Sequence, residues 1–379
     1  PIVAFLYDFD KTLCTTDMQN YAFIPSLGMT PAEFWELANG FGRRNRIDGI
    51  LAYMYTMIQE SKRKNILFTR QDLVEKGKSI VLFPGVQDWF RRINEFGAAQ
   101  GVQVEHYVIS SGLKEIIEGS AIADEFKEIY ASEFYYDETG TPVWPKLDVN
   151  FTAKTQFVYR INKGVLDVAN DKDLNASMPD DSKRVPFTNM IYVGDGLSDV
   201  PCMKMMRAYG GQAIAVYQES NRMGVEDLMA KGRVDFIFPA DYREGTGLDA
   251  TVKNIIRKMA VTDLLAAVLN KHLHDLTANE INLPIMMEME RAMGSRPELV
   301  SVAVKIIYEA MNELDQGELK VSGMDRLLEY PEFSDPDRMK EVLGEADAPS
   351  SKSSADELKA LFEKALPAYD RDRFYVSHM

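Results

Sequence analysis

Short apolar runs alternate with helix-like stretches through the first two thirds of this 379-residue chain. The runs, of about four to eight residues each, have the length and composition of strands that are buried on both faces. They lie at residues 2–7, 102–109, 190–193, 213–216 and 235–238. Helical spacing fills the intervals, at residues 85–96, 113–119, 155–162, 199–209 and 225–231. Strand and helix in this order predict an α/β fold, with a parallel sheet that carries helices on both faces.

Residues 15–82 interrupt this alternation with helical patterns alone. Thr30 and Glu33 have the spacing of a capping box, and Pro31 stands at the first helical position, which proline favours. A further helical stretch covers residues 69–80. The block therefore predicts a small all-helical insert between the first strand and the next strand–helix unit.

Gly140 marks the turn of a predicted β-hairpin, whose arms are residues 134–136 and 142–144. The polar stretch 170–184 predicts a surface loop. Strand patterns cease after about residue 249. Helical patterns follow at residues 255–276, 281–293, 299–314, 319–328 and 358–366, and residues 347–354 have the composition of a linker.

Charge is spread unevenly along the chain. The sequence has 43 Lys and Arg against 58 Asp and Glu, a net charge of −15. Residues 261–379 hold 13 basic and 23 acidic residues and so carry −10 of that charge. Nucleic-acid backbones and anionic membranes both require clustered positive charge, so we expect neither as a partner. No apolar run approaches the ~18–20 residues that a membrane span needs.

These shifts predict four regions. Residues 1–14 and 83–260 form the α/β core, and residues 15–82 form the helical insert. Residues 261–345 form an all-helical C-terminal extension, and residues 346–379 form a linker and a terminal helix. The acidic extension, 261–379, is a candidate surface for a protein partner or for a homo-oligomer.

The two cysteines, Cys14 and Cys202, are too few for a disulfide scaffold or a multi-cysteine metal site. The four histidines form no metal-binding motif. The low cysteine count favours a protein of the reducing cytoplasm.

Acidic residues follow two of the predicted strands directly. Asp8 and Asp10 come after the first strand, and Asp195 and Asp199 come after the strand at 190–193. Because ligands bind beyond the carboxyl ends of parallel strands, we expect these carboxylates to converge. Carboxylates without histidine or cysteine make a site for a hard cation, of which Mg²⁺ fits best.

Two further polar groups have suitable places. Ser110 follows the second predicted strand, and Lys154 opens the helix at 155–162. A hydroxyl near a helix start binds phosphate oxygens, and a lysine neutralises negative charge. Taken alone, each of these residues has an ordinary structural explanation, as a turn, a helix cap or a surface lysine. Their order along the chain, each at a strand end or a helix start, is what makes the combination specific.

The combination resembles the haloacid dehalogenase (HAD) superfamily. Asp-Phe-Asp-Lys-Thr-Leu at residues 8–13 resembles its first motif, Ser110 its second, Lys154 its third, and Gly-Asp-Gly-Leu-Ser-Asp at 194–199 its fourth. The resemblance covers residues 1–260, implies a Rossmannoid sheet, and places the insert where the family carries its C1-type helical cap.

Ser-Ser-Gly-Leu at residues 110–113 resembles the phosphoserine-phosphatase-like branch of the superfamily. The match departs at Ser111, where that branch has glycine. Two other lysines, Lys146 and Lys163, lie near enough in sequence to be alternatives to Lys154.

The resemblance implies a catalytic role for two carboxylates. Asp8 would be the nucleophile that forms an aspartyl-phosphate, and Asp10 the general acid and base. An aspartate two residues after the nucleophile distinguishes the family's phosphatases and phosphomutases from its dehalogenases and cation pumps. Mg²⁺ would be held by Asp8, the main-chain carbonyl of Asp10 and Asp195, while Asp199 would orient a neighbouring group.

The resemblance also implies which residues bind the phosphoryl group. They are Ser110, Ser111, Lys154, Thr12 and the backbone at Phe9. The cap would determine which leaving group is accepted. Its basic cluster, Arg43, Arg44 and Arg46, is a candidate for binding a carboxylate or second phosphate of the substrate, and a solvated loop before the helix that starts near Asp48 is the alternative explanation.

Three functions remain open on the sequence. The first is a Mg²⁺-dependent phosphatase of the HAD superfamily that hydrolyses a small phosphorylated metabolite. The second is a phosphotransferase or phosphomutase that passes the phosphoryl group on Asp8 to another acceptor. The third, of a different class, is a catalytically idle module that binds a protein through residues 261–379. Clustered, mutually repelling carboxylates have no use in an idle site, which favours an enzyme.

Overall fold

A computed structural model describes residues 1–179 and 182–275 of the chain. The chain divides into two units, residues 1–263 and 264–379. The helices expected at 281–293, 299–314, 319–328 and 358–366, and the linker at 347–354, lie outside the described residues. Within the described part of the chain, no helix is long and apolar enough to cross a membrane.

The described sheet has seven strands in the order β4-β3-β2-β1-β5-β6-β7. Their bounds are β1 Ile2–Tyr7, β2 Gln103–Leu113, β3 Glu128–Tyr136, β4 Pro142–Leu147, β5 Met190–Gly194, β6 Gln212–Tyr217 and β7 Phe236–Pro239. Neighbouring strands are parallel except for β3 and β4, which form the antiparallel edge. The predicted α/β fold class is confirmed.

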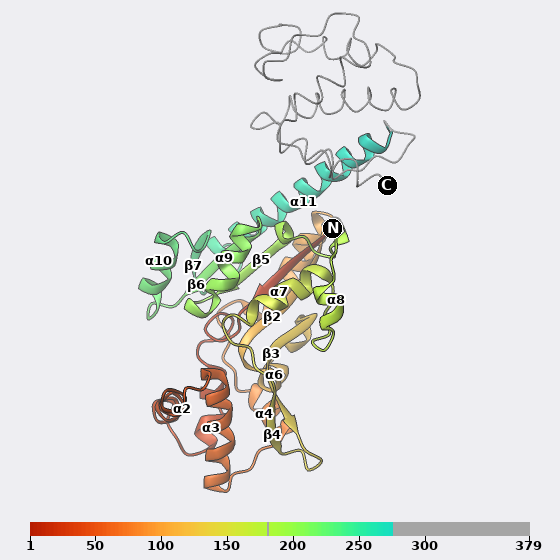
Figure 1. Ribbon diagram of the computed structural model, residues 1–379. Coiled ribbons are helices and arrows are strands. Elements are labelled where there is room, and N and C mark those ends of the chain that lie inside the picture. The colour runs from red at the N-terminus through yellow and green to blue at the C-terminus, as the bar shows by residue number, and fades with distance from the viewer. Residues whose placement is uncertain (180–181, 276–379) are drawn as a thin grey trace, which may run out of the picture. The chain divides into compact units, whose positions relative to one another are not determined.

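Helices cover both faces of this sheet (Figure 1). Their bounds are α5 Val86–Ala99, α6 Lys114–Glu118, α7 Lys154–Lys163, α9 Val200–Ala208, α10 Arg222–Ala230 and α11 Gly247–Asp275. In β1, Phe5 and its alternate neighbours pack in the core with α5 and α11, whereas Leu6 packs in the core with α7 and α9. Burial on both faces explains why this strand is apolar throughout.

The helical insert between β1 and α5 contains α1 Phe23–Ser26, α2 Pro31–Asn45, α3 Gly49–Lys64 and α4 Arg70–Gly77. The predicted capping box at the start of α2 is present, with both of its hydrogen bonds. Figure 1 shows α2 and α3 side by side, away from the centre of the sheet. The two connections to the core pair with each other, because Cys14 and Leu82 form a short antiparallel bridge.

Two regions differ from the sequence-based expectation. The hairpin arm expected at 134–136 is the end of a longer strand, since β3 begins at Glu128 and pairs with β2 in parallel. The stretch 170–184, expected to be a loop, contains the short helix α8 Asp171–Asn175. Four 3-10 turns complete the described elements: η1 Met18–Asn20, η2 Ala123–Glu125, η4 Phe187–Asn189 and η5 Leu197–Asp199.

The strand order determines where a site can form. β1 lies between β2 and β5, and all three strands run in the same direction. Strands β2 to β4 lie on one side of β1, and strands β5 to β7 lie on the other. The crevice beyond the carboxyl end of β1 is therefore a topological switch point, where ligands commonly bind. The segments after β1, β2 and β5 therefore meet at one edge.

Candidate active site

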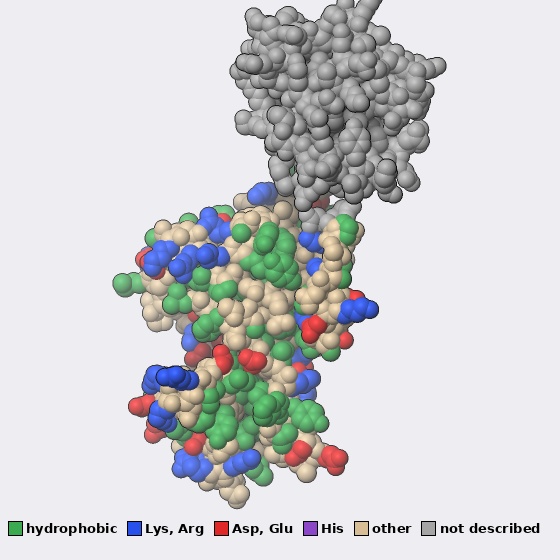
Figure 2. Space-filling view, viewed as in Figure 1, with side chains coloured by type: hydrophobic (Ala, Val, Ile, Leu, Met, Phe, Trp, Pro, Cys, Tyr) green, Lys and Arg blue, Asp and Glu red, His purple; other side chains and the backbone are tan. Residues whose placement is uncertain are grey.

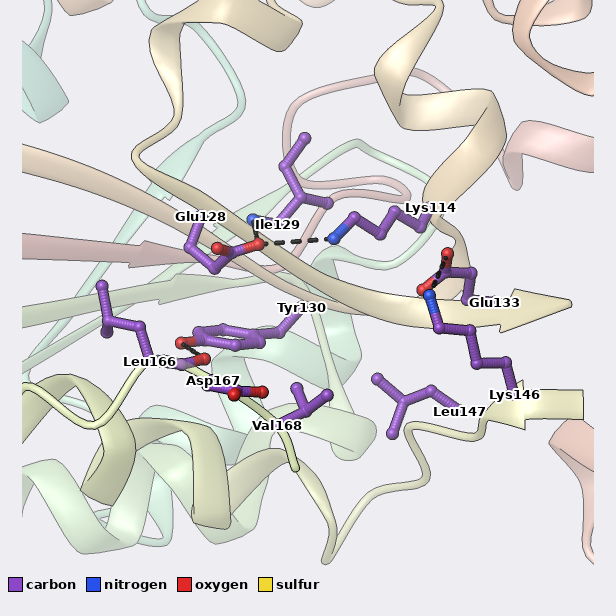
Figure 3. Close-up of a pocket in the computed structure, with 10 residues that line it drawn as sticks. All are labelled: Lys114, Glu128, Ile129, Tyr130, Glu133, Lys146, Leu147, Leu166, Asp167 and Val168. Carbon is purple, nitrogen blue, oxygen red and sulfur yellow. Dashed lines mark hydrogen bonds and ion pairs between the residues drawn. The ribbon is translucent and has the colours of Figure 1, made fainter. Parts of the chain in front are cut away.

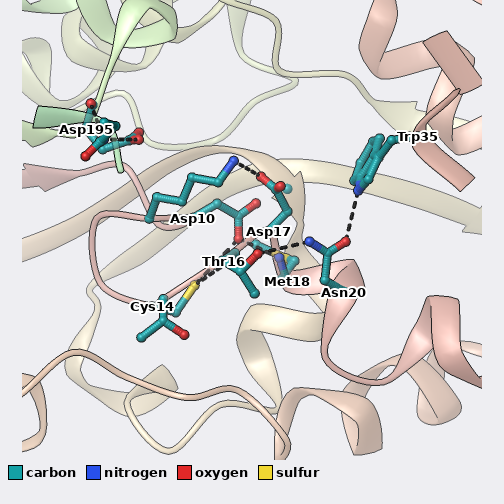
Figure 4. Close-up of polar contacts among 12 residues, drawn as sticks. Asp10, Cys14, Thr16, Asp17, Met18, Asn20, Trp35 and Asp195 are labelled. Carbon is teal, nitrogen blue, oxygen red and sulfur yellow. Dashed lines mark hydrogen bonds and ion pairs between the residues drawn. The ribbon is translucent and has the colours of Figure 1, made fainter. Parts of the chain in front are cut away.

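The loop after β1 holds two buried carboxylates in different surroundings. The backbone N–H of Asp8 donates to the carbonyl of Val193 at 2.9 Å, which continues the sheet into the loop. The Oδ1 of Asp10 accepts a hydrogen bond from the N–H of Met18 at 2.8 Å (Figure 4). Directly after Asp10, Lys11 has a φ of 60°, a left-handed conformation that is uncommon for a residue other than glycine. The loop thus turns sharply after Asp10.

Lys154, at the start of α7, joins the carboxylates of two strands. Its Nζ donates to Oδ1 of Asp8 at 2.9 Å and to Oδ1 of Asp199 at 2.7 Å, and its side chain is 1% exposed. The alternative lysines have other partners: Lys146 pairs with Glu133, and Lys163 donates to backbone carbonyls. The structure therefore brings Lys154 to Asp8.

Asp199 is held by four donors, two on each oxygen. Its Oδ1 accepts from Lys154 and from the Tyr192 hydroxyl, and its Oδ2 accepts from the N–H groups of Asp195 and Gly196. A side chain at Gly194 would come within 2.5 Å of Oδ2, so glycine is needed for this approach. Asp199 is positioned to fix the loop and Lys154.

The end of β2 carries a bulge at the same edge of the sheet. The pairing with β3 shifts between Ser110 and Leu113, and bulges of this kind often redirect side chains at functional sites. The Ser110 hydroxyl, which is buried, accepts from the N–H of Gly112. The Ser111 hydroxyl instead donates to the carbonyl of Val149 at 2.7 Å.

Carboxylates of Asp8, Asp195 and Asp199 each offer an oxygen, and these oxygens lie within 4.8 Å of one another. Burial, together with the charges of Asp8 and Asp199, raises the pKa of Asp195 to about 8. Burial raises the pKa of Asp8 to about 6, although Lys154 opposes this shift. Such raised values mean that the chain supplies less positive charge here than its carboxylates need when ionised.

The haloacid dehalogenase-like hydrolase family model matches residues 5–204, slightly more than half of the chain. The chain belongs to the haloacid dehalogenase-like hydrolase family. The expectation of a HAD hydrolase is therefore confirmed. A second model, that of the HrcA protein C-terminal domain, matches residues 250–353.

Curated relatives of this HAD hydrolase fall into two groups. An uncharacterized protein of Borreliella burgdorferi is 26% identical over 277 residues, which cover 65% of this chain and 94% of that protein. The heat-inducible transcription repressor HrcA of Acetivibrio thermocellus is 28% identical over 99 residues. This second alignment covers 24% of the chain and only 28% of the repressor.

Solved structures with a similar fold include a HAD family hydrolase from Salmonella enterica serovar Typhi. It is 15% identical, with a TM-score of 0.42, over 66% of this chain and 70% of that one. A phosphoserine phosphohydrolase-like protein from Francisella tularensis is 18% identical, with a TM-score of 0.40, over 62% of this chain and 94% of that one.

The donor set of this HAD hydrolase fits a divalent cation. Asp199 has both oxygens occupied by donors, whereas the carboxylates of Asp8 and Asp195 each keep capacity to bind a cation. Buried oxygens whose charges repel one another are what a hard cation neutralises. Asp8 and Asp195 could therefore hold Mg²⁺ from the side chains present.

Sequence reasoning missed the β6–α10 loop. Asn221 donates to the carbonyl and to Oδ2 of Asp195, at 3.3 and 3.4 Å, and accepts from the N–H of Gln218. Gln218 in turn donates to the carbonyl of Thr15, at the start of the insert. The sequence signal for Asn221 was only that it is a polar residue soon after the predicted strand at 213–216. Polar residues are common after any strand, so this signal does not single it out.

The basic residues of the insert lie at its surface. Arg43 and Arg44 are in the last turn of α2 and Arg46 caps it, and all three side chains are exposed. Figure 2 shows basic side chains gathered over this helix. The structure therefore places the cluster at a helix end rather than in a loop.

A cavity of about 200 Å³ lies beside β3 and β4, apart from the carboxylates (Figure 3). Four of its charged side chains are paired, Lys114 with Glu128 and Lys146 with Glu133, while Asp167 accepts from the N–H of Ala169. Most of the charge at this cavity is therefore balanced within the chain, unlike that at Asp8.

Proposed function

We propose that this hydrolase cleaves phosphate monoesters of small molecules in a Mg²⁺-dependent reaction, with Asp8 as the nucleophile. The observation that carries the proposal is the contact of Asp8 with Lys154, at 2.9 Å, next to Asp195 and Asp199. A buried carboxylate beside a lysine and a cation site is suited to attack on an anionic phosphoryl group. The net charge of −15 fits a small substrate better than a polyanionic one.

The first step transfers the phosphoryl group to Asp8. A carboxylate oxygen attacks phosphorus, and the bond from phosphorus to the ester oxygen breaks. The electron pair goes to the leaving oxygen, which takes a proton from Asp10. Burial, followed by the charges of Asp17 and Asp8, raises the pKa of Asp10 well above its usual value, which favours the protonated form that this step needs.

The second step returns the enzyme to its starting state. Asp10, now a carboxylate, accepts a proton from water as the water oxygen attacks phosphorus. The bond from phosphorus to the Asp8 oxygen breaks, and inorganic phosphate leaves. The same carboxyl group thus serves both steps, which requires it to approach the leaving oxygen and the water from the same side.

The phosphoryl oxygens face donors of the chain itself. Lys154 and the backbone N–H of Phe9 donate to Asp8, and together with the Ser110 hydroxyl they would bind the oxygens of the phosphoryl group. The Thr12 hydroxyl is buried and has no hydrogen-bond partner among the described residues, while the Thr12 carbonyl accepts from the Tyr242 hydroxyl. When bound, Mg²⁺ would neutralise the repulsion between the nucleophile and the phosphate dianion. Asp8, the carbonyl of Asp10 and Asp195 would hold it, and Asp199 would keep Lys154 oriented.

The helical insert would act as a cap over the leaving group. Its helix α3 reaches the β2 loop, because the Tyr53 hydroxyl donates to the carbonyl of Ser111 at 2.8 Å. The exposed Arg43, Arg44 and Arg46 remain candidates for binding a charged substrate group. A rise in KM with unchanged kcat in Arg44→Ala would support that role, and unchanged kinetics in all three alanine variants would reject it.

The test is hydrolysis of p-nitrophenyl phosphate by the full chain. We expect turnover with Mg²⁺, loss after exhaustive chelation, and recovery when Mg²⁺ is returned. Full activity in the chelated protein would contradict the cation dependence. Addition of glycerol as an acceptor separates hydrolysis from transfer, since a phosphotransferase would release more nitrophenol than inorganic phosphate.

We further propose that residues 261–379 mediate contact with a protein, either another copy of the chain or a different one. The match of residues 250–353 to the HrcA C-terminal domain model favours this role over a second catalytic one. Sedimentation velocity over a hundredfold range of concentration tests self-association. A monomer throughout would exclude the homo-oligomer.

A further inference from the structure

The turn after β1, residues 8–13 and here called the β1 loop, has one peptide that is held at both of its polar groups. The N–H of Leu13 donates to the carbonyl of Phe9 at 2.9 Å, which closes the turn. The carbonyl of Thr12, in the same peptide, accepts from the hydroxyl of Tyr242 at 2.7 Å. The first contact lies within the loop, whereas the second comes from a residue 230 positions away. The β1 loop therefore takes one of its anchors from a distant side chain.

Tyr242 lies in the connection between β7 and α11, and its side chain is fully buried. Its ring meets that of Trp89 edge-on, with the two centroids 5.2 Å apart. Its backbone N–H donates to the carbonyl of Pro84 at 2.8 Å. Burial is the main cause that raises the pKa of its hydroxyl well above the usual value, so the hydroxyl stays protonated. The side chain is thus held in place as a donor to the β1 loop.

A buried ion pair fixes the backbone of Tyr242. Arg92, on α5, donates through Nη2 to the carbonyl of Tyr242, and through Nη1 to Oδ1 of Asp249 at 2.7 Å. The side chains of Arg92 and Asp249 are only 12% and 3% exposed. Asp249 lies in the first turn of α11, and its Oδ2 accepts from Gly245 and Lys253. A planar guanidinium holds two acceptors in a fixed geometry, so α5 and α11 together clamp the segment that carries Tyr242.

The position of the acceptor distinguishes Tyr242 from a tyrosine that only stabilises the fold. A phenylalanine would fill the same space, so packing alone does not account for the hydroxyl. The chain has a comparable bond elsewhere: Tyr130, 1% exposed, donates to the carbonyl of Leu166 at 2.9 Å beside the cavity of Figure 3. Thr12, in contrast, lies in the same short turn as Asp8 and Asp10.

We infer that Tyr242 is a positioning residue for the reaction, whose hydroxyl holds the β1 loop in the conformation that presents Asp8 and Asp10 to the phosphoryl group. The inference rests on the proposed phosphatase function and adds a residue to it. Arg92 acts through Tyr242, because it holds the backbone that carries the ring. A shift of about 1 Å in a reacting group can cost as much as about 10²-fold in rate. Lys154 and Ser110 bind the substrate from outside this loop, so we expect the loss in kcat rather than in KM.

The test compares Tyr242→Phe with Tyr130→Phe in the full chain. Each variant removes one buried hydroxyl that donates to a backbone carbonyl. In Tyr242→Phe we expect kcat for p-nitrophenyl phosphate to fall about tenfold, with KM within about twofold of wild type. In Tyr130→Phe kcat should stay within about twofold, although both variants should lower the midpoint of thermal unfolding. An unchanged kcat in Tyr242→Phe, or equal losses in the two variants, would overturn the inference.

Amide hydrogen exchange, followed by mass spectrometry, tests the loop without reference to activity. Peptides that cover residues 8–14 should exchange at least about fivefold faster in Tyr242→Phe than in wild type or Tyr130→Phe. Unchanged exchange in these peptides would overturn the positioning role even if kcat falls. A wild-type chain without phosphatase activity would instead refute the proposed function, and exchange alone would then decide whether Tyr242 anchors the loop.

Arg92→Lys tests the clamp behind Tyr242. Lysine keeps the charge but lacks the fork that reaches both the carbonyl of Tyr242 and Asp249. We expect kcat to fall about threefold, and to fall no further when the change is made in Tyr242→Phe. Additive losses would show that Arg92 does not act through Tyr242. Should Tyr242→Phe fail to fold, exchange at residues 8–14 in Arg92→Lys decides: faster exchange supports the anchor, and unchanged exchange overturns it.

Discussion

Two buried clusters of charged residues lie at opposite ends of β2, and they are built in opposite ways. Near the strand's amino end, Glu105 accepts hydrogen bonds from Arg184, Lys127 and Tyr107. These partners lower the pKa of Glu105 to about 2, although burial alone would raise it. At the carboxyl edge of the sheet, Lys154 is the cation shared by Asp8 and Asp199, and the pKa of Asp195 is raised.

The difference separates a structural charge cluster from a functional one. A carboxylate whose donors all come from the chain stabilises the fold and has nothing left for a ligand. Carboxylates that lack enough donors destabilise the empty protein and bind whatever supplies positive charge. Burial alone does not distinguish the two, since Glu105 and Asp8 are both 5% exposed.

The largest expected effect is at Asp8, the proposed nucleophile. Asp8→Asn should lower kcat for p-nitrophenyl phosphate by at least about 10³-fold, because an amide cannot form the phosphoryl intermediate. Its midpoint of thermal unfolding should stay level or rise, since one of the repelling charges is gone. Full turnover in this variant would refute the mechanism, and a strong loss of stability would refute the contrast between the clusters.

Asp10→Asn should cause the next largest loss of activity. Without the proton donor we expect kcat to fall about 10²- to 10⁴-fold, with the fold intact. The loss should be smaller for p-nitrophenyl phosphate than for an alkyl phosphate, because nitrophenolate leaves without a proton. Equal losses on the two substrates, measured by phosphate release, would argue against Asp10 as the general acid.

Glu105→Gln should lower stability and leave activity nearly unchanged, the reverse of what we expect for Asp8→Asn. Removal of this charge leaves Arg184 without its partner and should lower the free energy of unfolding by about 2 kcal/mol. Urea denaturation measures this change, and kcat of the folded protein should stay within about twofold. A larger fall in kcat would mean that the two ends of β2 are coupled.

The smallest effect is on the pH dependence of stability, which should have opposite signs at the two clusters. The folded pKa of Asp195 lies above its unfolded value, so metal-free protein should gain stability from this group as pH falls below about 8. The folded pKa of Glu105 lies below its unfolded value, so stability from that group should be lost as pH falls from about 4.5 toward 2.

Matched variants isolate the two contributions. The stability difference between wild type and Asp195→Asn should narrow as pH falls from 8, by no more than about 1.4 kcal/mol per unit. The difference between wild type and Glu105→Gln should narrow only in the acid range. If the two stability differences changed with pH in the same way, the proposed contrast between the two charge clusters would be wrong.

Local patterns predicted some elements well. The apolar run at 2–7 became β1, Ile2–Tyr7, because burial on both faces requires such a run and Asp8 ends it. Residues 128–133 were missed as a strand because polar side chains interrupt their apolar pattern. Those side chains are satisfied by tertiary neighbours: Glu128 pairs with Lys114, and Ser132 donates to the carbonyl of Ser111.

The sequence by itself determined the α/β class, the helical insert and the acidic residues at strand ends, since these follow from periodicity and from spacing along the chain. Only the tertiary structure decided that Lys154, rather than a nearby lysine, meets Asp8, and that the Tyr242 hydroxyl reaches the β1 loop. Lys154 and Asp8 are 146 positions apart. Their meeting depends on strand order and on how the loops pack, and no local pattern encodes either.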